Sequence, residues 1–202
     1  MPRVLVTGFE AFADLETNPS AEAVRHLRRR ALPEVATAIL PVTWEGAVKL
    51  LRAHAAHARI DRCLMLGVAR RATTLRVERQ ALNGTNAMAD NAGIVRAGRP
   101  LSETQPLESA AGPDPAWLAR WVDALTAAGV AYELSDDAGR YLCNALYWSA
   151  VTGPASWAKQ SVFVHVPPCP DEEAQARLNA QVEAAVLCYR DLDAAPHCKG
   201  KG

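Results

Sequence analysis

Cys143, His165 and Glu78 are the residues of this 202-residue chain whose types together could break an acyl bond. A thiolate attacks a carbonyl carbon, a histidine moves the thiol proton to the leaving group, and a carboxylate fixes the histidine tautomer. Cys143 follows a loop and begins an apolar segment that is typical of a buried helix. Because the amide groups of a helix N-terminus favour a thiolate, Cys143 is the candidate nucleophile.

The other two candidates are expected at the ends of strands. His165 lies late in the apolar run 161–166 and is followed by two prolines, which stop a strand, and Glu78 follows the β-branched stretch 73–77. Functional sites in open α/β sheets lie at the carboxyl ends of the strands, so we expect Glu78 and His165 to lie close together at that edge of the sheet. The competing interpretation is structural: a packed thiol, a hydrogen-bonded histidine and a surface glutamate.

Short apolar runs alternate with segments of helical period along the chain, which predicts an α/β fold. We expect one domain over residues 1–202, in three α/β/α layers around a twisted, largely parallel and partly mixed sheet, with a mobile tail at 194–202. The expected strands are 4–8, 35–40, 62–67, 73–77, 130–134 and 161–166, and the expected helices are 19–30, 44–58, 115–128, 142–151 and 171–190. The region 83–115 is rich in Pro, Gly, Asn and Asp, which predicts an irregular excursion of the kind that carries or covers a site.

Composition excludes several classes of partner. Lys plus Arg and Asp plus Glu both number 22, so the basic excess of a nucleic-acid-binding protein is missing. The apolar runs are far shorter than the roughly 20 residues that span a bilayer, and the N-terminus does not resemble a signal peptide. The five cysteines form no C-x-x-C pair, which indicates reduced thiols. We therefore expect a cytoplasmic protein that binds neither nucleic acid nor membrane.

Two groups of side chains contain residue types that can bind a metal. His54 and His57 stand three apart on a predicted helix, and Cys143, His165 and Cys169 form a second possible set. No recognised ligand spacing joins either group, and the prolines around Cys169 stiffen its segment. We therefore expect no metal and no other cofactor.

Four segments, in the same order and with similar spacing, resemble the cysteine peptidases of the pyroglutamyl peptidase I family, also called pyrrolidone-carboxylate peptidases. They are residues 6–12 with Asn18-Pro19, residues 78–83 with 90–93, residues 138–144, and residues 165–167. The resemblance implies that Cys143 is the nucleophile, His165 its proton carrier and Glu78 the orienting carboxylate. It also implies an exopeptidase that removes an N-terminal pyroglutamyl residue from peptides through a thioacyl enzyme, and a homo-oligomer, either a tetramer or a dimer.

The substrate of that family explains further residues. A five-membered lactam is small, uncharged and mostly apolar, so its pocket needs hydrophobic walls and few polar groups. The resemblance assigns the walls to Phe9 and Phe12, completed by residues near the nucleophile and in the excursion: Tyr141, Leu142 and Met88. The backbone N–H of Cys143 is expected to contribute to an oxyanion hole.

The chain departs from the family pattern at several positions. The first loop, residues 8–14, lacks the usual proline and glycines, Val68 stands where a glutamine often follows Gly67, and the segment after His165 is short. Ala87 occupies the position of a common arginine, which Arg70, Arg71 or Arg79 could replace.

Two other functions stay open at this point. The protein could be a cysteine amidohydrolase that acts on another small cyclic or N-terminal amide. It could also be a homologue that binds a ligand with little turnover. The peptides cleaved are not specified by the sequence.

Overall fold

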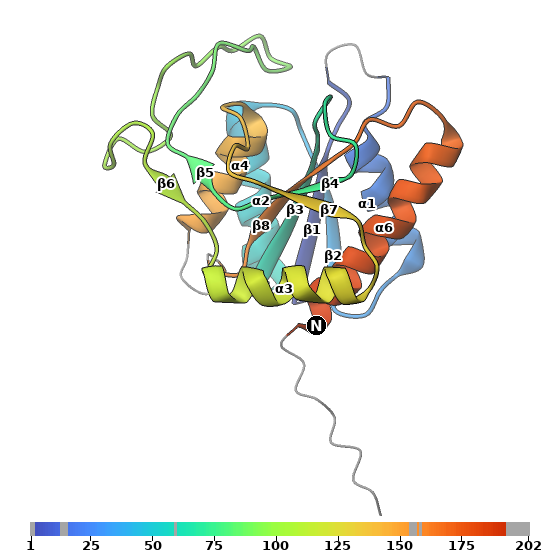
Figure 1. The fold of residues 1–202 in the computed structure, drawn as a ribbon. Helices are drawn as coiled ribbons and strands as arrows, with labels where there is room; N and C mark the ends of the chain where they lie inside the picture. Colours follow the sequence, from blue (N-terminus) through green and yellow to red (C-terminus); the bar gives the residue numbers. More distant parts are fainter. Residues whose placement is uncertain (1–2, 13–15, 59, 154–156, 158, 193–202) are drawn as a thin grey trace, which may run out of the picture.

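A computed structural model shows a six-stranded sheet between two layers of helices (Figure 1). It describes residues 3–192 except 13–15, 59, 154–156 and 158, so the predicted tail lies outside the described residues. The strands, in their order across the sheet, are β2 (Val35–Leu40), β1 (Val4–Phe9), β3 (Arg62–Val68), β8 (Val162–Val166), β4 (Leu75–Glu78) and β7 (Tyr132–Ser135). The first four run parallel, which confirms the predicted α/β class with a largely parallel, partly mixed sheet.

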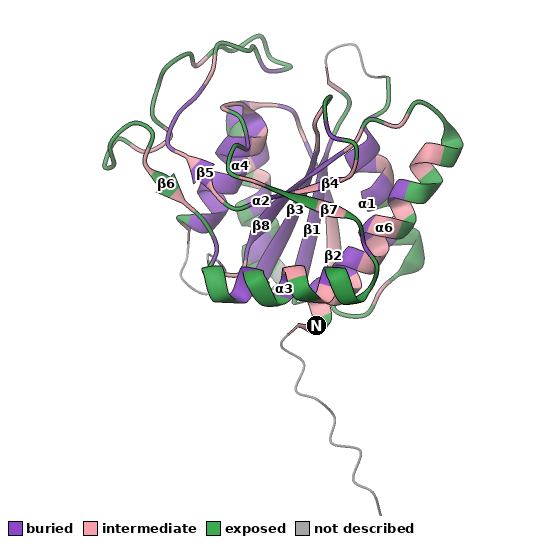
Figure 2. Ribbon diagram, in the orientation of Figure 1, coloured by how far each residue is buried: buried purple, intermediate pink, exposed green. Residues whose placement is uncertain are grey.

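Among the residues that the structure describes, five helices form the outer layers. On one face lie α2 (Trp44–Ala58) and α4 (Leu142–Val151), and on the other lie α1 (Pro19–Arg30), α3 (Pro115–Ala127) and α6 (Glu172–Asp191). The central strands β1, β3 and β8 are buried on both sides (Figure 2), as sheets covered on both faces require, whereas the edge strands β2 and β7 are partly exposed. No helix within the described ranges is long and apolar enough to cross a membrane.

Side chains alternate between the two cores along each central strand. Leu5, Met65 and Phe163 pack under α2 and α4, whereas their neighbours Val6 and Leu64 pack under the opposite helices. Because side chains alternate along a strand with a period of two residues, every second residue of β8 faces α4. His165 therefore shares the face of Phe163.

Polar caps begin three of the helices. Asn18 Oδ1 accepts the N–H of Ser20 at 3.0 Å ahead of Pro19, as the sequence predicted. Asp114 and Asp171 cap α3 and α6 in the same way. These caps fix where each helix starts against the sheet.

The direction of β4 corrects one expectation. β4 is antiparallel to β8, so Arg76 lies opposite His165, and Glu78 lies opposite Phe163. Glu78 and His165 therefore do not meet at the carboxyl ends of parallel strands. The physical reason is the connection 69–74, which is far shorter than the dozen or so residues that a parallel crossover needs.

The predicted excursion is irregular apart from a two-stranded ladder of β5 (Ala81–Leu82) and β6 (Ala110–Ala111). The buried Asn83 organises its middle, because the side-chain amide donates to the carbonyls of Ser102, Gln105 and Pro106. Side-chain hydrogen bonds thus replace the missing secondary structure.

Asp90 ties the same excursion to the start of α2. Its carboxylate accepts the backbone N–H groups of Trp44, Ala92 and Ile94, each at 2.9 Å. The backbone N–H of Asn91 donates to the Val42 carbonyl. The excursion is consequently held against the helix layer that contains α4.

Candidate active site

Cys143 is the second residue of α4. The first helical hydrogen bond runs from the Ala145 N–H to the Tyr141 carbonyl, so the Cys143 N–H belongs to the turn whose N–H groups have no helical acceptor. Asn144, which is fully buried, anchors this turn: its side chain accepts the Leu82 N–H and donates to the Leu82 carbonyl, both at 2.8 Å. The helix start is thereby tied to the chain that follows Glu78.

Gly67 gives the thiol its space. A Cβ atom on Gly67 would lie 2.8 Å from Cys143 Sγ and 2.8 Å from the ring of Phe163. Gly67 is also the register partner of His165 in the parallel pair of β3 and β8. The sulfur of Cys143 therefore packs against the backbone of Gly67, next to His165.

His165 connects the thiol to the carboxylate. Its Nδ1 lies 2.7 Å from Glu78 Oε1, and Cys143 lines the same cavity as His165, close enough to the ring to affect its charge. Glu78 is fully buried, and Tyr147 Oη donates to its backbone carbonyl at 2.8 Å. The structure therefore brings all three predicted catalytic residues together, with the buried Glu78 hydrogen-bonded to His165 and the thiol of Cys143 close to the ring.

The same contacts set the charge of His165. Burial opposes a charged ring, but the interactions of the ring with Cys143 and Glu78 outweigh it and raise the pKa of His165 to about 9. The imidazole is therefore protonated at neutral pH. An imidazolium beside a thiol is the partner that stabilises a thiolate.

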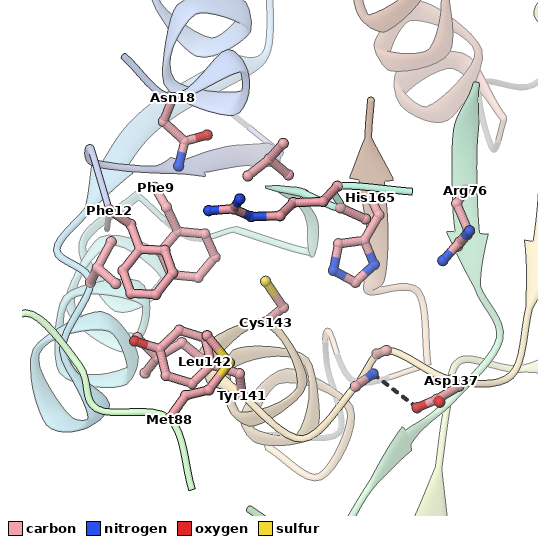
Figure 3. Close-up of a pocket in the computed structure, with 16 residues that line it drawn as sticks. Phe9, Phe12, Asn18, Arg76, Met88, Asp137, Tyr141, Leu142, Cys143 and His165 are labelled. Atoms are coloured by element: carbon pink, nitrogen blue, oxygen red, sulfur yellow. Dashed lines mark hydrogen bonds between the residues drawn. The ribbon is translucent and has the colours of Figure 1, made fainter. Parts of the chain in front are cut away.

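A cavity of about 340 Å³ opens above the thiol (Figure 3). Its walls are mostly apolar, and they include every residue that the sequence assigned to substrate binding: Phe9, Phe12, Met88, Tyr141 and Leu142. Cys143 and His165 line the same cavity. The predicted pocket and the predicted nucleophile thus coincide in space.

Tyr141 is the centre of an aromatic cluster at this cavity. Its ring lies 5.2 Å from Phe12 and 5.3 Å, edge to face, from Trp44. Its hydroxyl donates to the Ala89 carbonyl at 2.8 Å, next to Met88. The sequence does not single out Trp44, because a tryptophan at the start of an amphipathic helix usually packs in the core.

The three arginines proposed to replace the family arginine separate in space. Arg70 lines the cavity, whereas Arg79 pairs with Asp136 outside it, and Arg71 is not a lining residue. Ala87 is exposed and does not line the cavity either.

Two charged residues of the cavity were not predicted. Arg76 and Asp137 both line it. The sequence does contain a signal that places Arg76 at the site. Arg76 stands two residues before Glu78, and side chains two residues apart in a strand project from the same face of the sheet. No comparable signal marked Asp137, which lies in a loop.

Neither suspected metal group is assembled in the structure. His54 and His57 are both exposed on α2. Within the part of the chain that is described, no group of three or more His, Cys, Asp or Glu side chains could hold a metal ion. The cysteines of that part, Cys63, Cys143, Cys169 and Cys188, are free thiols.

Known proteins share this fold and sequence. A sequence model of the pyroglutamyl peptidase family matches residues 2–190. The pyrrolidone-carboxylate peptidase of Vibrio vulnificus is 32% identical over 176 residues, which cover 85% of this chain and 81% of the relative. The enzyme of the same name from Thermococcus onnurineus is 33% identical over 174 residues, covering 82% and 83%.

Solved structures agree with the sequence relatives. Pyroglutamyl peptidase I from Bacillus amyloliquefaciens superposes with a TM-score of 0.80 over 96% of this chain and 99% of its own, at 24% identity, which shows the shared fold. Pyrrolidone carboxyl peptidase from Fervidobacterium islandicum gives a TM-score of 0.77 at 28% identity, covering 95% and 98%. With a family match over almost its whole length and relatives above 30% identity, this chain belongs to the pyroglutamyl peptidase family.

Proposed function

We propose that this protein is a cysteine exopeptidase that removes an N-terminal pyroglutamyl residue from peptides. The observation that carries the proposal is the placement of Cys143 beside the hydrogen-bonded pair of His165 and Glu78 at an apolar, aromatic-walled cavity. Family membership supports the same activity, since the matching relatives are named pyrrolidone-carboxylate peptidases.

Acylation begins with the thiolate of Cys143 and the imidazolium of His165. The sulfur attacks the pyroglutamyl carbonyl carbon, and the oxygen takes the negative charge beside the Cys143 N–H. The tetrahedral intermediate then breaks its C–N bond as His165 gives its proton to the leaving nitrogen. The shortened peptide leaves with a free amine, and a thioester joins the lactam residue to Cys143.

Deacylation reverses the proton flow. The now neutral His165 takes a proton from water, and the hydroxide oxygen attacks the thioester carbon. Collapse of this second intermediate releases pyroglutamate and restores the thiolate with the imidazolium. Glu78, hydrogen-bonded to Nδ1, keeps the ring oriented through both steps.

The cavity explains why a lactam is favoured over an ordinary N-terminus. Phe9, Phe12 and Leu142 offer apolar surface to the ring. Asp137 lines the cavity away from these aromatic rings, so a free α-ammonium group would lose its hydration at the aromatic end without an anionic side chain beside it, which costs several kcal/mol or shifts the group to its neutral form. A pyroglutamyl residue has no such charge, because its amine is already an amide.

Hydrolysis of a fluorogenic pyroglutamyl amide tests the proposal. We expect release of the fluorophore by the unaltered chain and by Cys188→Ser, whose thiol packs in the core on the far side of the sheet, but not by Cys143→Ser. Release only from other small cyclic or N-terminal amides would favour the amidohydrolase. A folded protein that is inert toward all of these amides would be the binding homologue.

The predicted homo-oligomer and cytoplasmic location are part of the same proposal. Both rest on the sequence and its family resemblance. Sedimentation velocity of the purified chain tests the first, and fractionation of the source cells tests the second. A monomer, or a protein found outside the cytoplasm, would contradict them.

A further inference from the structure

The cavity has two chemically different ends on either side of the thiol (Figure 3). Phe9 and Phe12 lie to one side of Cys143, whereas His165 lies to the other side and Arg76 lies beyond it. If the lactam occupies the aromatic end, the scissile nitrogen must face His165, because that ring supplies its proton. The residue that follows the lactam then extends toward Arg76.

Arg76 is placed to meet that residue. It lies directly opposite His165 in the antiparallel pair of β4 and β8, and opposite residues project from the same face of a sheet. Its side chain is 27% exposed and lines the cavity. The substrate chain that passes His165 therefore meets a guanidinium next.

The hydrogen bonding of Arg76 leaves one edge of its guanidinium available. Its Nε donates to Glu133 Oε1 at 2.6 Å, which fixes the side chain. Among the residues that the structure describes, its terminal nitrogens Nη1 and Nη2 make no hydrogen bond. Two parallel N–H groups of this kind match the two oxygens of a carboxylate.

The neighbouring charges do not cancel this preference. Asp137 lines the same cavity, but its Oδ1 accepts the Gly139 N–H at 2.9 Å and Arg140 Nη1 at 3.1 Å. Glu133 is 44% exposed, so water screens its charge. Arg70 adds a further positive charge to the cavity lining.

We propose that Arg76 binds a carboxylate on the first residue of the leaving peptide, which makes such pyroglutamyl peptides the preferred substrates. The carboxylate has two possible sources: the free C-terminus of a pyroglutamyl dipeptide, or the side chain of Asp or Glu at the position after the scissile bond. This inference rests on the proposed peptidase activity and names the substrate class of the same site.

Two matched pairs of substrates test it and separate the two sources. Pyroglutamyl-alanine is compared with its C-terminal amide, and pyroglutamyl-glutamic acid α-amide with pyroglutamyl-glutamine amide. We expect kcat/KM to favour the carboxylate by roughly three- to tenfold in at least one pair, the size expected for a partly exposed ion pair. The preference should shrink as salt is raised.

Variants assign the preference to a residue. In Arg76→Gln the ratio of kcat/KM values within the favoured pair should fall to about one. Arg79→Gln is the matched control, because Arg79 follows the same strand but pairs with Asp136 outside the cavity. It should keep the ratio of the unaltered protein. The salt dependence needs no variant and remains informative if Arg76→Gln does not fold.

Several results would overturn the inference. These are equal kcat/KM values within both pairs for the unaltered protein, a preference that salt does not change, or a preference that survives Arg76→Gln and disappears in Arg70→Gln. Cleavage of all four substrates without a charge preference overturns this inference alone. Cleavage of none overturns the proposed peptidase activity, and this inference with it.

Discussion

Glu78 reaches His165 diagonally across the antiparallel ladder, from the position opposite Phe163, with Oε1 2.7 Å from Nδ1. The carboxylate is thereby fully buried under the ring instead of lying at the sheet edge. Its second oxygen, Oε2, has no hydrogen-bond partner among the described residues. A buried carboxylate with so few partners depends on the positive charge of the imidazolium for its stabilisation.

The Glu78→Gln substitution should therefore lower kcat strongly. The amide keeps the size of the side chain but removes the charge that orients and stabilises the imidazolium, and losses of about 10²- to 10⁴-fold are typical of such changes. Steady-state hydrolysis of a pyroglutamyl amide measures it. Glu183→Gln is the matched control, because Glu183 accepts from His26 Nε2 at 2.6 Å far from the cavity. It should leave kcat unchanged, and equal losses in both variants would contradict the assignment.

The pH profile of activity should have an alkaline limb near pH 9. Burial disfavours the charged ring, but Cys143 and Glu78 raise the pKa of His165 to about 9, and the proton that the leaving amine needs is lost above that pH. Without the Glu78 carboxylate the pKa of His165 falls, so Glu78→Gln should move the limb to lower pH. Profiles of kcat/KM between pH 5 and 10 check both statements. A limb that does not move would exclude His165 as the titrating group.

The same shift has a consequence for stability. A histidine whose folded pKa exceeds its unfolded value of about 6.5 stabilises the fold fully below that value. The contribution is lost as pH rises through about 9, the pKa of His165 in the folded protein. Urea unfolding of the unaltered chain and of His165→Gln across this range should show a difference between them that changes with pH. A constant difference would contradict the linkage.

Gly67→Ala should damage the site more than the fold. The added methyl would lie 2.8 Å from Cys143 Sγ and 2.8 Å from the Phe163 ring, so the thiol must move. A displacement of about 1 Å can cost on the order of 100-fold in rate, and we expect kcat/KM to fall at least about 10-fold.

The control for this substitution separates strain from site geometry. Gly129→Ala adds a methyl at a φ of +69° with no neighbouring atom within 4 Å. It should lower the melting temperature through backbone strain of about 1–2 kcal/mol without changing kcat/KM. If Gly67→Ala behaved like Gly129→Ala, the contact between Gly67 and the thiol would have no role in catalysis.

Tyr141→Phe should weaken substrate binding while sparing the chemical step. The variant keeps the ring contacts with Phe12 and Trp44 but loses the hydrogen bond from the hydroxyl to the Ala89 carbonyl. Loss of one such bond, worth about 0.5–1.5 kcal/mol, predicts a KM that is roughly two- to tenfold higher with little change in kcat. Tyr132→Phe, at the remote edge strand β7, should change neither constant. A selective fall in kcat would instead place the hydroxyl in the reaction.

Most of the fold could be predicted because its local signals agree with its tertiary structure. The Asn18-Pro19 cap starts α1, the predicted helix 142–151 has the bounds of α4, and the apolar runs become buried strands. The direction of β4 was harder to predict from the sequence. Hydrophobic periodicity indicates which residues of a strand are buried, but it does not indicate whether the strand runs parallel or antiparallel to its neighbour. Only the short connection 69–74 indicated a reversal.

The candidate site was predictable in part for the same reason. Local sequence patterns place Cys143 at the start of a helix and His165 at the end of a strand. The family resemblance added the residues of the apolar cavity lining. Arg76, Asp137 and Trp44 join the site through tertiary contacts between elements, and no local pattern specifies those contacts. Glu78 was predicted as a member of the triad, but its burial beneath His165 follows from the antiparallel pairing alone.

Trapping of the acyl enzyme would show directly whether Cys143 is the nucleophile. A pyroglutamyl ester is mixed with the protein, the reaction is quenched in acid, and the digested chain is analysed by mass spectrometry. We expect a pyroglutamyl thioester on the peptide that contains Cys143, faster to form than to decay, and absent from Cys143→Ser. Turnover of the ester with no adduct on Cys143, or with the adduct on Cys169 or Cys188, would contradict it.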